Sequence, residues 1–284
     1  MDLTPLTTVA IASDFSEPAS VAVAWGHRLA ALHGARVVLI HVLGTASDHH
    51  LTEDEARRGL DGIAASLRAE GLRVDIEMAS GAVASVLHSV AERVGADVLV
   101  IGSHGHGVIK RLMIGSVADE LLRQARLPLL VVHPRDGQRR IDFRTALVGI
   151  DFNDPSQRAA ACALRLLERH ADSQLLLLAA TQIPLTFVGP DAPAMPLVEV
   201  TEVNDSARDG IQRLTKALGG HGVRVEGLVC PGAPSEAIMD TAEDRRVDFV
   251  AVGSEPRSGA ARLLLGSIAK DVIHHAVCPV LVVR

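Results

Sequence analysis

Two short stretches of the chain combine an acidic side chain, glycines and a hydroxyl group. The first is Ala12–Asp14, which directly follows an apolar run. The second is the loop GSHGHG at Gly102–Gly107, followed by Gly115–Val117 at the start of a helical pattern. Glycines let backbone amides approach a phosphate closely, and a helix N-terminus adds further amides and a positive dipole end. This combination is typical of an oxyanion site.

The same groups have the chemistry that a nucleotide needs. The carboxylate of Asp14 can accept hydrogen bonds from ribose hydroxyls or from a base amine. The hydroxyl of Ser116 can cap its helix and can also reach an oxyanion. A larger residue at Gly115 would crowd the phosphate path and would disfavour a positive φ. The alternative is that these residues are loop glycines and a helix cap without a ligand.

The elements that must position these residues occur twice in the 284-residue chain. VAIASDFSEPAS at Val9–Ser20 returns 137 residues later as ALVGIDFNDPSQ, and the segment from Ala96 returns 151 residues later. The difference predicts a net insertion of 14 residues in the second half, best placed in the Pro- and Gly-rich stretch Ile183–Pro196. We expect two domains, at 1–137 and 144–284, because this length is typical of two domains.

Each half has the pattern of alternating strands and helices. Apolar runs at 8–12, 36–43, 73–78, 98–102 and 129–133 are typical of strands buried on both faces of a parallel sheet. Between them lie helical patterns, with a capping box at Thr52-x-x-Glu55 and caps at Ser16 and Asn153 just before a proline. Such alternation predicts a doubly wound α/β fold with two five-stranded parallel sheets.

Composition excludes several classes of protein. The formal net charge of −6 argues against nucleic acid as a partner, since phosphate neutralisation requires a basic face. No apolar run approaches the roughly 20 residues of a membrane helix, and no signal peptide opens the sequence. The odd number of cysteines, Cys162, Cys230 and Cys278, favours neither a disulfide framework nor a zinc knuckle. These features predict a cytoplasmic protein.

The order of motifs resembles a known family. Gly102-x2-Gly105-x9-Gly115-Ser116 is similar to the ATP-binding signature of universal stress proteins, as are SDFSEPA after the first strand and LPLLVV at the last. The resemblance covers each half once and is therefore to the tandem two-domain members. It implies a strand order 3-2-1-4-5 in each half, with the two domains paired through their last strands.

The resemblance also implies roles for eight residues. Adenine and ribose would contact Ala12, Asp14 and Val42, and ribose would also lie near Gly102. The phosphates would lie among Gly105, Gly115, Ser116 and Val117. The implied cofactor is ATP with Mg²⁺, and the implied function is a nucleotide-binding stress-response protein that regulates an unknown protein partner.

The second half departs from this pattern. Gly253 and Gly266–Ser267 are retained, but Pro256 stands where the second glycine belongs and Glu255 precedes it. Proline removes an amide donor and fixes φ, which impairs close approach to a phosphate. Asp151 survives, and Arg257, Arg262 and Lys270 could partly compensate. We therefore expect ATP in the first half only.

Other chemistry has less support. His49–His50, His104 with His106, and His274–His275 are close in sequence, but no carboxylate or cysteine completes a metal set, so no metal site is expected. His104 and His106 are better interpreted as donors beside phosphate. The absence of a nucleophile elbow and of a P-loop argues against catalysis and leaves at most a slow ATPase. A third alternative is a module that binds a non-nucleotide ligand in the second half, where Ile183–Pro196 could line a pocket.

Three further expectations concern the thiols and the assembly. Cys162 in a helix and Cys278 in a strand are expected to be small core residues, and Cys230 is expected in a loop. The apolar final strands at 129–132 and 280–283 would each leave a sheet edge open, so we expect them to pair about a pseudo-two-fold axis. Further dimerisation of the whole chain is left open.

Overall fold

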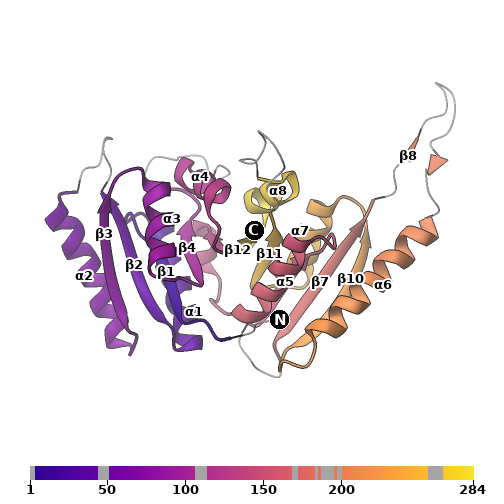
Figure 1. Ribbon diagram of the computed structural model, residues 1–284, viewed down its shortest axis with the longest axis horizontal. Helices are drawn as coiled ribbons and strands as arrows, with labels where there is room; N and C mark the ends of the chain where they lie inside the picture. The colour runs from indigo at the N-terminus through magenta and orange to yellow at the C-terminus, as the bar shows by residue number, and fades with distance from the viewer. Residues whose placement is uncertain are drawn as a thin grey trace.

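The fold is an α/β architecture that repeats along the chain (Figure 1). The computed structural model describes residues 4–43, 51–105, 114–167, 172–182, 185–186, 195–196, 200–254 and 265–284. The elements of the first half are β1 (Thr8–Ala12), α1 (Glu17–His33), β2 (Arg36–Leu43), α2 (Glu53–Ala69), β3 (Val74–Ser80), α3 (Val83–Arg93), β4 (Val98–Gly102), α4 (Ser116–Gln124) and β5 (Leu129–Val132).

The second half repeats this order after a short 3-10 helix, η1 (Pro134–Gln138). Its elements are β6 (Thr145–Gly149), α5 (Asp154–Leu166), β7 (Gln174–Thr181), β8 (Leu185–Thr186), β9 (Met195–Pro196), α6 (Val200–Leu218), β10 (Arg224–Pro231), α7 (Pro234–Asp244), β11 (Phe249–Gly253), α8 (Ser267–His275) and β12 (Val280–Val283). The pair β8–β9 is antiparallel and falls at the predicted insertion, most of which lies outside the described residues.

One ten-stranded sheet runs through both halves in the order β10-β7-β6-β11-β12-β5-β4-β1-β2-β3. Within each half the strands are parallel and follow the order 3-2-1-4-5, which confirms the predicted fold. One buried apolar cluster, which includes Trp25 of α1, covers one face of the sheet, and a second, which includes Leu121 of α4, covers the other. Both clusters draw on residues of the two halves, so each core layer is continuous.

Local sequence explains where the helices begin. The hydroxyl of Thr52 accepts from the Glu55 amide at 3.3 Å and the Glu55 carboxylate accepts from the Thr52 amide at 2.8 Å, so the predicted capping box forms. Ser16 caps α1 and Asn153 caps α5, each with proline in the first turn. These caps satisfy amides that would otherwise lack a partner at the helix ends.

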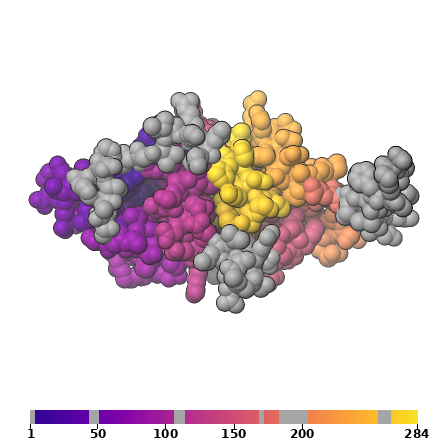
Figure 2. All heavy atoms as spheres, turned by 90° about the horizontal axis from the view of Figure 1, so that it is seen from above, coloured from indigo at the N-terminus to yellow at the C-terminus, as the bar shows by residue number. Residues whose placement is uncertain are grey.

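The two halves meet where β5 pairs with β12, and this is the one antiparallel contact within the large sheet of described residues. Leu130 pairs with Leu281, which is its counterpart in the repeat, so the register is symmetric about this residue pair. Figure 2 shows the C-terminal segment of the second half against the first half in the middle of the molecule. Each final strand thus covers the sheet edge that the other would leave open, as we expected from the sequence.

A fragment of residues 1–140 is expected to form a homodimer. It keeps β5 but loses β12, and the symmetric register means that a second copy of β5 can replace β12 in the same backbone register, with Leu129 in the place of Val280. Analytical ultracentrifugation of the fragment, alongside the full chain, measures this. A fragment that remains monomeric at high concentration would show that β5 needs no partner.

The linker between the halves, residues 133–144, is held by both of them. Phe143 is fully buried and its ring centroid lies 5.4 Å from that of Trp25 and 5.6 Å from that of Phe249. Arg139 donates from its two terminal nitrogens to the backbone oxygens of Val277 and Val247, at 2.7 and 2.8 Å. Phe143 therefore belongs to the core between the halves.

Two aspartates have the same structural role, one in each half, at the amino ends of the strands. Asp97, before β4, accepts from the amides of Thr7 and Thr8, and Asp248, before β11, accepts from those of Arg144 and Thr145. Each carboxylate thus fixes the start of the first strand of its half.

Among the helices that the structure describes, none combines the length and the hydropathy needed to cross a bilayer.

Candidate functional site

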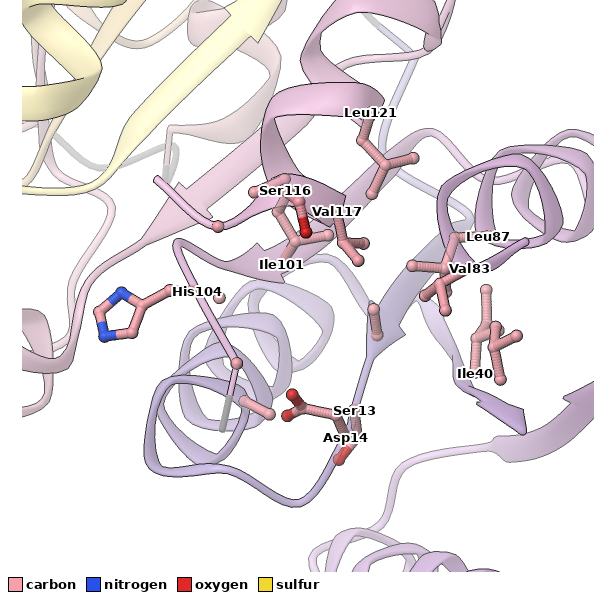
Figure 3. Close-up of a pocket in the computed structure, with 17 residues that line it drawn as sticks. Ser13, Asp14, Ile40, Val83, Leu87, Ile101, His104, Ser116, Val117 and Leu121 are labelled. Atoms are coloured by element: carbon pink, nitrogen blue, oxygen red, sulfur yellow. The ribbon is translucent and has the colours of Figure 1, made fainter. Parts of the chain in front are cut away.

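The candidate site lies at the carboxyl edge of the sheet, between β1 and β4. The strands wind from β1 toward β3 in one direction and from β4 toward β5 in the other, and ligands of open α/β sheets bind at such a reversal. A cavity of about 300 Å³ opens there, between the ends of β1, β2 and β4 and the helices α3 and α4 (Figure 3).

The structure brings all eight residues singled out from the sequence into the wall of this one cavity. They are Ala12, Asp14, Val42, Gly102, Gly105, Gly115, Ser116 and Val117. The wall also contains Ile40, Val83 and Leu87, which group together at the end of the cavity away from His104 in Figure 3. Sequence analysis did not single out Val83 and Leu87, which lie in the first two turns of α3. Their position at the start of that helix was the available signal.

Asp14 is oriented by its neighbours. Its Oδ1 accepts from the amide of Ser16 at 3.0 Å and from the Ser16 hydroxyl, while Ser16 Oγ accepts from the amide of Ala19 and caps α1. Its Oδ2 lies so close to Gly105 that a Cβ atom added there would overlap it. Gly105 is therefore needed for the close approach of the loop after β4 to this exposed carboxylate.

A buried histidine that sequence analysis missed supports the loop of Asp14. His41, on β2, is 7% exposed and its Nδ1 lies 2.8 Å from the backbone oxygen of Ser13. Its ring centroid lies 5.0 Å from that of Phe15, which has a left-handed backbone with φ of 64°. The edge of the Phe15 ring rests on Gly59 of α2, where a Cβ atom would lie 2.6 Å away. A polar residue inside an apolar strand was the only sequence signal for this support.

The start of α4 differs from the prediction. Gly115, not Ser116, is the N-cap, and the structure has no side-chain cap bond there, so the predicted cap by Ser116 is wrong. The amide of Gly115 donates to the backbone oxygen of Ser103 at 2.8 Å and joins the two ends of the loop. The first three residues of the helix, 116–118, line the cavity, and amides of a first turn have no partner within their own helix. This leaves an oxyanion-accepting helix end at the cavity.

Gly115 and Gly102 are glycines because of close packing. The φ of Gly115 is −66°, so the expected need for a positive φ is wrong, but an added Cβ would lie 3.0 Å from the Cα of His104. An added Cβ at Gly102 would lie 2.8 Å from the Cβ of Pro18 in α1. Gly253 meets Pro155 in the same way, so this packing role is common to both halves.

His104 belongs to the wall of the cavity. Its Nδ1 lies 2.9 Å from Ser103 Oγ, and its imidazole points away from Ser116 (Figure 3). Burial, and then the nearby His133, hold the pKa of His104 below its usual value, so the ring is neutral at pH 7. The role of His104 as a donor beside phosphate stays a prediction, because a neutral imidazole keeps one N–H donor, while His106 lies outside the described residues.

The other metal and thiol predictions can be placed in part. The described residues contain no group of three histidines, cysteines or carboxylates that could hold a metal ion. His49 and His50 lie outside them, as do Glu255, Pro256, Arg257 and Arg262.

Burial raises the pKa of the Cys162 and Cys278 thiols to about 12, which keeps both protonated at neutral pH. Cys278 precedes β12 and Cys230 lies within β10, so both expected locations are corrected.

The fold and the cavity define a doubly wound α/β protein with a cavity at its strand reversal. The chain belongs to the universal stress protein family, whose model matches residues 6–133 and again residues 142–284. It is 28% identical to a universal stress protein of Mycolicibacterium smegmatis over 297 aligned positions, covering 97% of this chain and 96% of that protein. A universal stress protein of Mycobacterium tuberculosis is 27% identical with the same coverage.

A solved structure shows the same fold. The crystal structure of a universal stress protein from Archaeoglobus fulgidus superposes with a TM-score of 0.72, covering 98% of both chains at 18% sequence identity. Its agreement over almost the full length extends to the arrangement of the two tandem halves.

Proposed function

We propose that the first half binds ATP together with Mg²⁺ and that the chain acts as a nucleotide-dependent stress-response protein. The observation that carries this proposal is the start of α4, which lines the cavity without a side-chain cap and faces a glycine loop held against Asp14. Uncapped amides at a helix N-terminus attract phosphate oxygens through hydrogen bonds and the helix dipole. The apolar end of the cavity would suit the adenine ring, and the carboxylate of Asp14 would suit the ribose hydroxyls.

Three parts of the cavity would take three parts of the ligand. Adenine would lie in the apolar end formed by Val42, Val83 and Leu87. Ribose would lie beside Asp14, whose carboxylate accepts hydrogen bonds from hydroxyl groups. The phosphates would extend along residues 116–118. In the absence of a three-residue metal cluster among the described residues, Mg²⁺ would be held by phosphate oxygens and water, as is usual for this ion with nucleotides.

The contrast with the second half supports one nucleotide per chain. Asp151 is the counterpart of Asp14, and both carboxylates accept hydrogen bonds from the backbone amide and the side chain of the residue two positions later. The difference between the halves therefore lies in the loop after the fourth strand. Pro256 lacks the amide that Gly105 offers in the first half.

Calorimetric titration of the full chain with ATP and Mg²⁺ tests this function. We expect a stoichiometry close to one per chain. Two equivalent sites would contradict the difference between the halves, and no binding would contradict the function itself. Phosphate release measured over hours in the same samples separates a nucleotide-dependent regulator, which retains ATP, from a slow ATPase.

Asp14→Ala is expected to weaken ATP binding by about 1–3 kcal/mol, or about 5–150-fold, the scale of hydrogen bonds to a charged group. The matched control is Asp151→Ala, the same change in the second half, which should leave the affinity unchanged. Calorimetry on the two variants and the natural chain measures the difference. Equal losses in both variants would show that the effect does not come from the first cavity.

The remaining parts of the proposal concern where and with what the protein acts. We place it in the cytoplasm, because its three cysteines are free in the structure. An unknown protein partner would respond to nucleotide occupancy of the first half. The domains at 1–137 and 144–284 would be the units that carry the intact and the degenerate motif.

A further inference from the structure

The second half has a cavity of its own that differs from the first. It opens at the equivalent edge of the sheet, between β6 and β11, and its volume is about 570 Å³, compared with about 300 Å³ in the first half. Volumes of this size are typical of sites for small organic molecules. All the residues used below belong to the described part of its wall.

The second cavity extends in a different direction because one side chain is missing. Strand pairing aligns Ile40 with Ala12 and Leu178 with Gly149, so the residue that corresponds to His41 is Ala179. Without an imidazole beside it, Phe152 is 39% exposed and lines the cavity. The cavity then continues past β7 to Ser206 and Ala207 on α6, whereas no described residue of α2 lines the first cavity.

The second cavity contains less of the helix end that suits phosphate than the first cavity does. Gly115, Ser116, Val117 and Ala118 line the first cavity, whereas of their counterparts only Ile268 lines the second, with 39% of its surface exposed. The described wall of the second cavity therefore offers an oxyanion less of a helix end.

The wall of the second cavity is apolar with a short polar edge. The apolar part of the wall consists of Phe152, Ile238, Val252 and Ile268. The hydroxyl and amide groups of the wall come from Thr181, Gln182 and Ser206, at the end of the cavity nearest α6. Its single described charge is Asp151, and no described cation forms an ion pair with that carboxylate. The first cavity offsets the charge of Asp14 with three residues of a helix end, whereas the described wall of the second offers one, so Asp151 disfavours an anionic ligand more strongly.

We propose that the second half is a separate binding site for a phosphate-free organic molecule with an apolar body and an uncharged or cationic polar group. The apolar body would lie on Phe152 and Ile268. The polar group would lie at Thr181, Gln182 and Asp151, where hydroxyl, amide and carboxylate groups can accept or donate hydrogen bonds. The proposal goes beyond ATP binding and concerns a different half of the chain.

Two fluorescent probes with the same aromatic body test the ligand class. N-phenyl-1-naphthylamine is uncharged, and 1-anilinonaphthalene-8-sulfonate is the same molecule with an added sulfonate. We expect the full chain to bind one uncharged probe with ATP and Mg²⁺ present in excess, and to bind the sulfonated probe at least about tenfold more weakly because of Asp151. Displacement of the uncharged probe by ATP would overturn the proposal, and so would its failure to bind.

A pair of equivalent substitutions locates the probe. Ile268→Glu introduces a carboxylate at an exposed position of the second cavity and is expected to weaken the uncharged probe at least about tenfold. Val117→Glu makes the matched change in the first cavity and should leave the probe affinity unchanged, whether or not ATP binds there. Circular dichroism confirms that both variants are folded. Loss of the probe in Val117→Glu, or its retention in Ile268→Glu, would show that the second cavity is not the site.

Discussion

A chain that carries Gly115→Val is expected to bind ATP at least about 100-fold more weakly than the natural chain, a loss of about 2.7 kcal/mol. An added Cβ at this position would lie 3.0 Å from the Cα and 3.3 Å from the Cβ of His104, which is tighter than most such contacts, and the two further carbons of valine need still more room. The loop after β4 would have to move away from α4, and Gly105 would move with it. The phosphates would then lose the loop and the helix end as a common site.

The fold should survive this change. Gly115 has φ of −66° and ψ of 155°, a conformation that valine adopts without strain. Gly266→Val is the matched control, because no described atom lies within 4 Å of a Cβ added there. Calorimetry should show the loss in the first variant only, with unchanged circular dichroism in both. If Gly115→Val binds ATP normally, α4 and its loop do not hold the phosphates.

Phe143→Ala is expected to lower the free energy of unfolding by about 3–5 kcal/mol, the usual cost of removing a buried phenylalanine ring. Phe143 is fully buried and packs with Trp25 of α1 and Phe249 of β11, so its loss leaves a cavity between the halves. Equilibrium unfolding in urea, followed by tryptophan fluorescence, measures the change because Trp25 is the single tryptophan of the chain and lies in this cluster.

The control for Phe143→Ala is Phe152→Ala. The same atoms are removed, but Phe152 is 39% exposed, so less apolar area returns to water and no closed cavity forms. We expect a loss of less than half that of Phe143→Ala. Equal losses in the two variants would show that the linker ring does not stabilise the contact between the halves.

Features that depend on near neighbours in the chain could be predicted from the sequence. The capping box of Thr52 and Glu55 and the cap at Ser16 involve residues at most three apart, and both form as expected. The repeat predicted the order of strands and helices, because each half must bury the same apolar runs. The residues of the first cavity could be predicted to lie together because parallel strands end at one edge of the sheet.

Features that depend on contacts between distant segments could not be predicted. The cap at Ser116 was wrong because the Gly115 amide bonds to Ser103, twelve residues earlier, which fixes where α4 begins. The neutral state of His104 depends on burial and on His133. His41 and Phe15 support the loop of Asp14 from another strand and with a left-handed backbone. No local pattern around these residues specifies such contacts.

The pairing of β5 with β12 inside one polypeptide has an evolutionary consequence. Two identical subunits joined through the same strands would carry every mutation twice, so a change harmful to one cleft would harm both. Here the two clefts are encoded by separate codons. The second half has Pro256 at the position equivalent to Gly105 and Ala179 at the position equivalent to His41. Covalent fusion thus releases one copy from selection on the other and allows the two to diverge within one folded molecule.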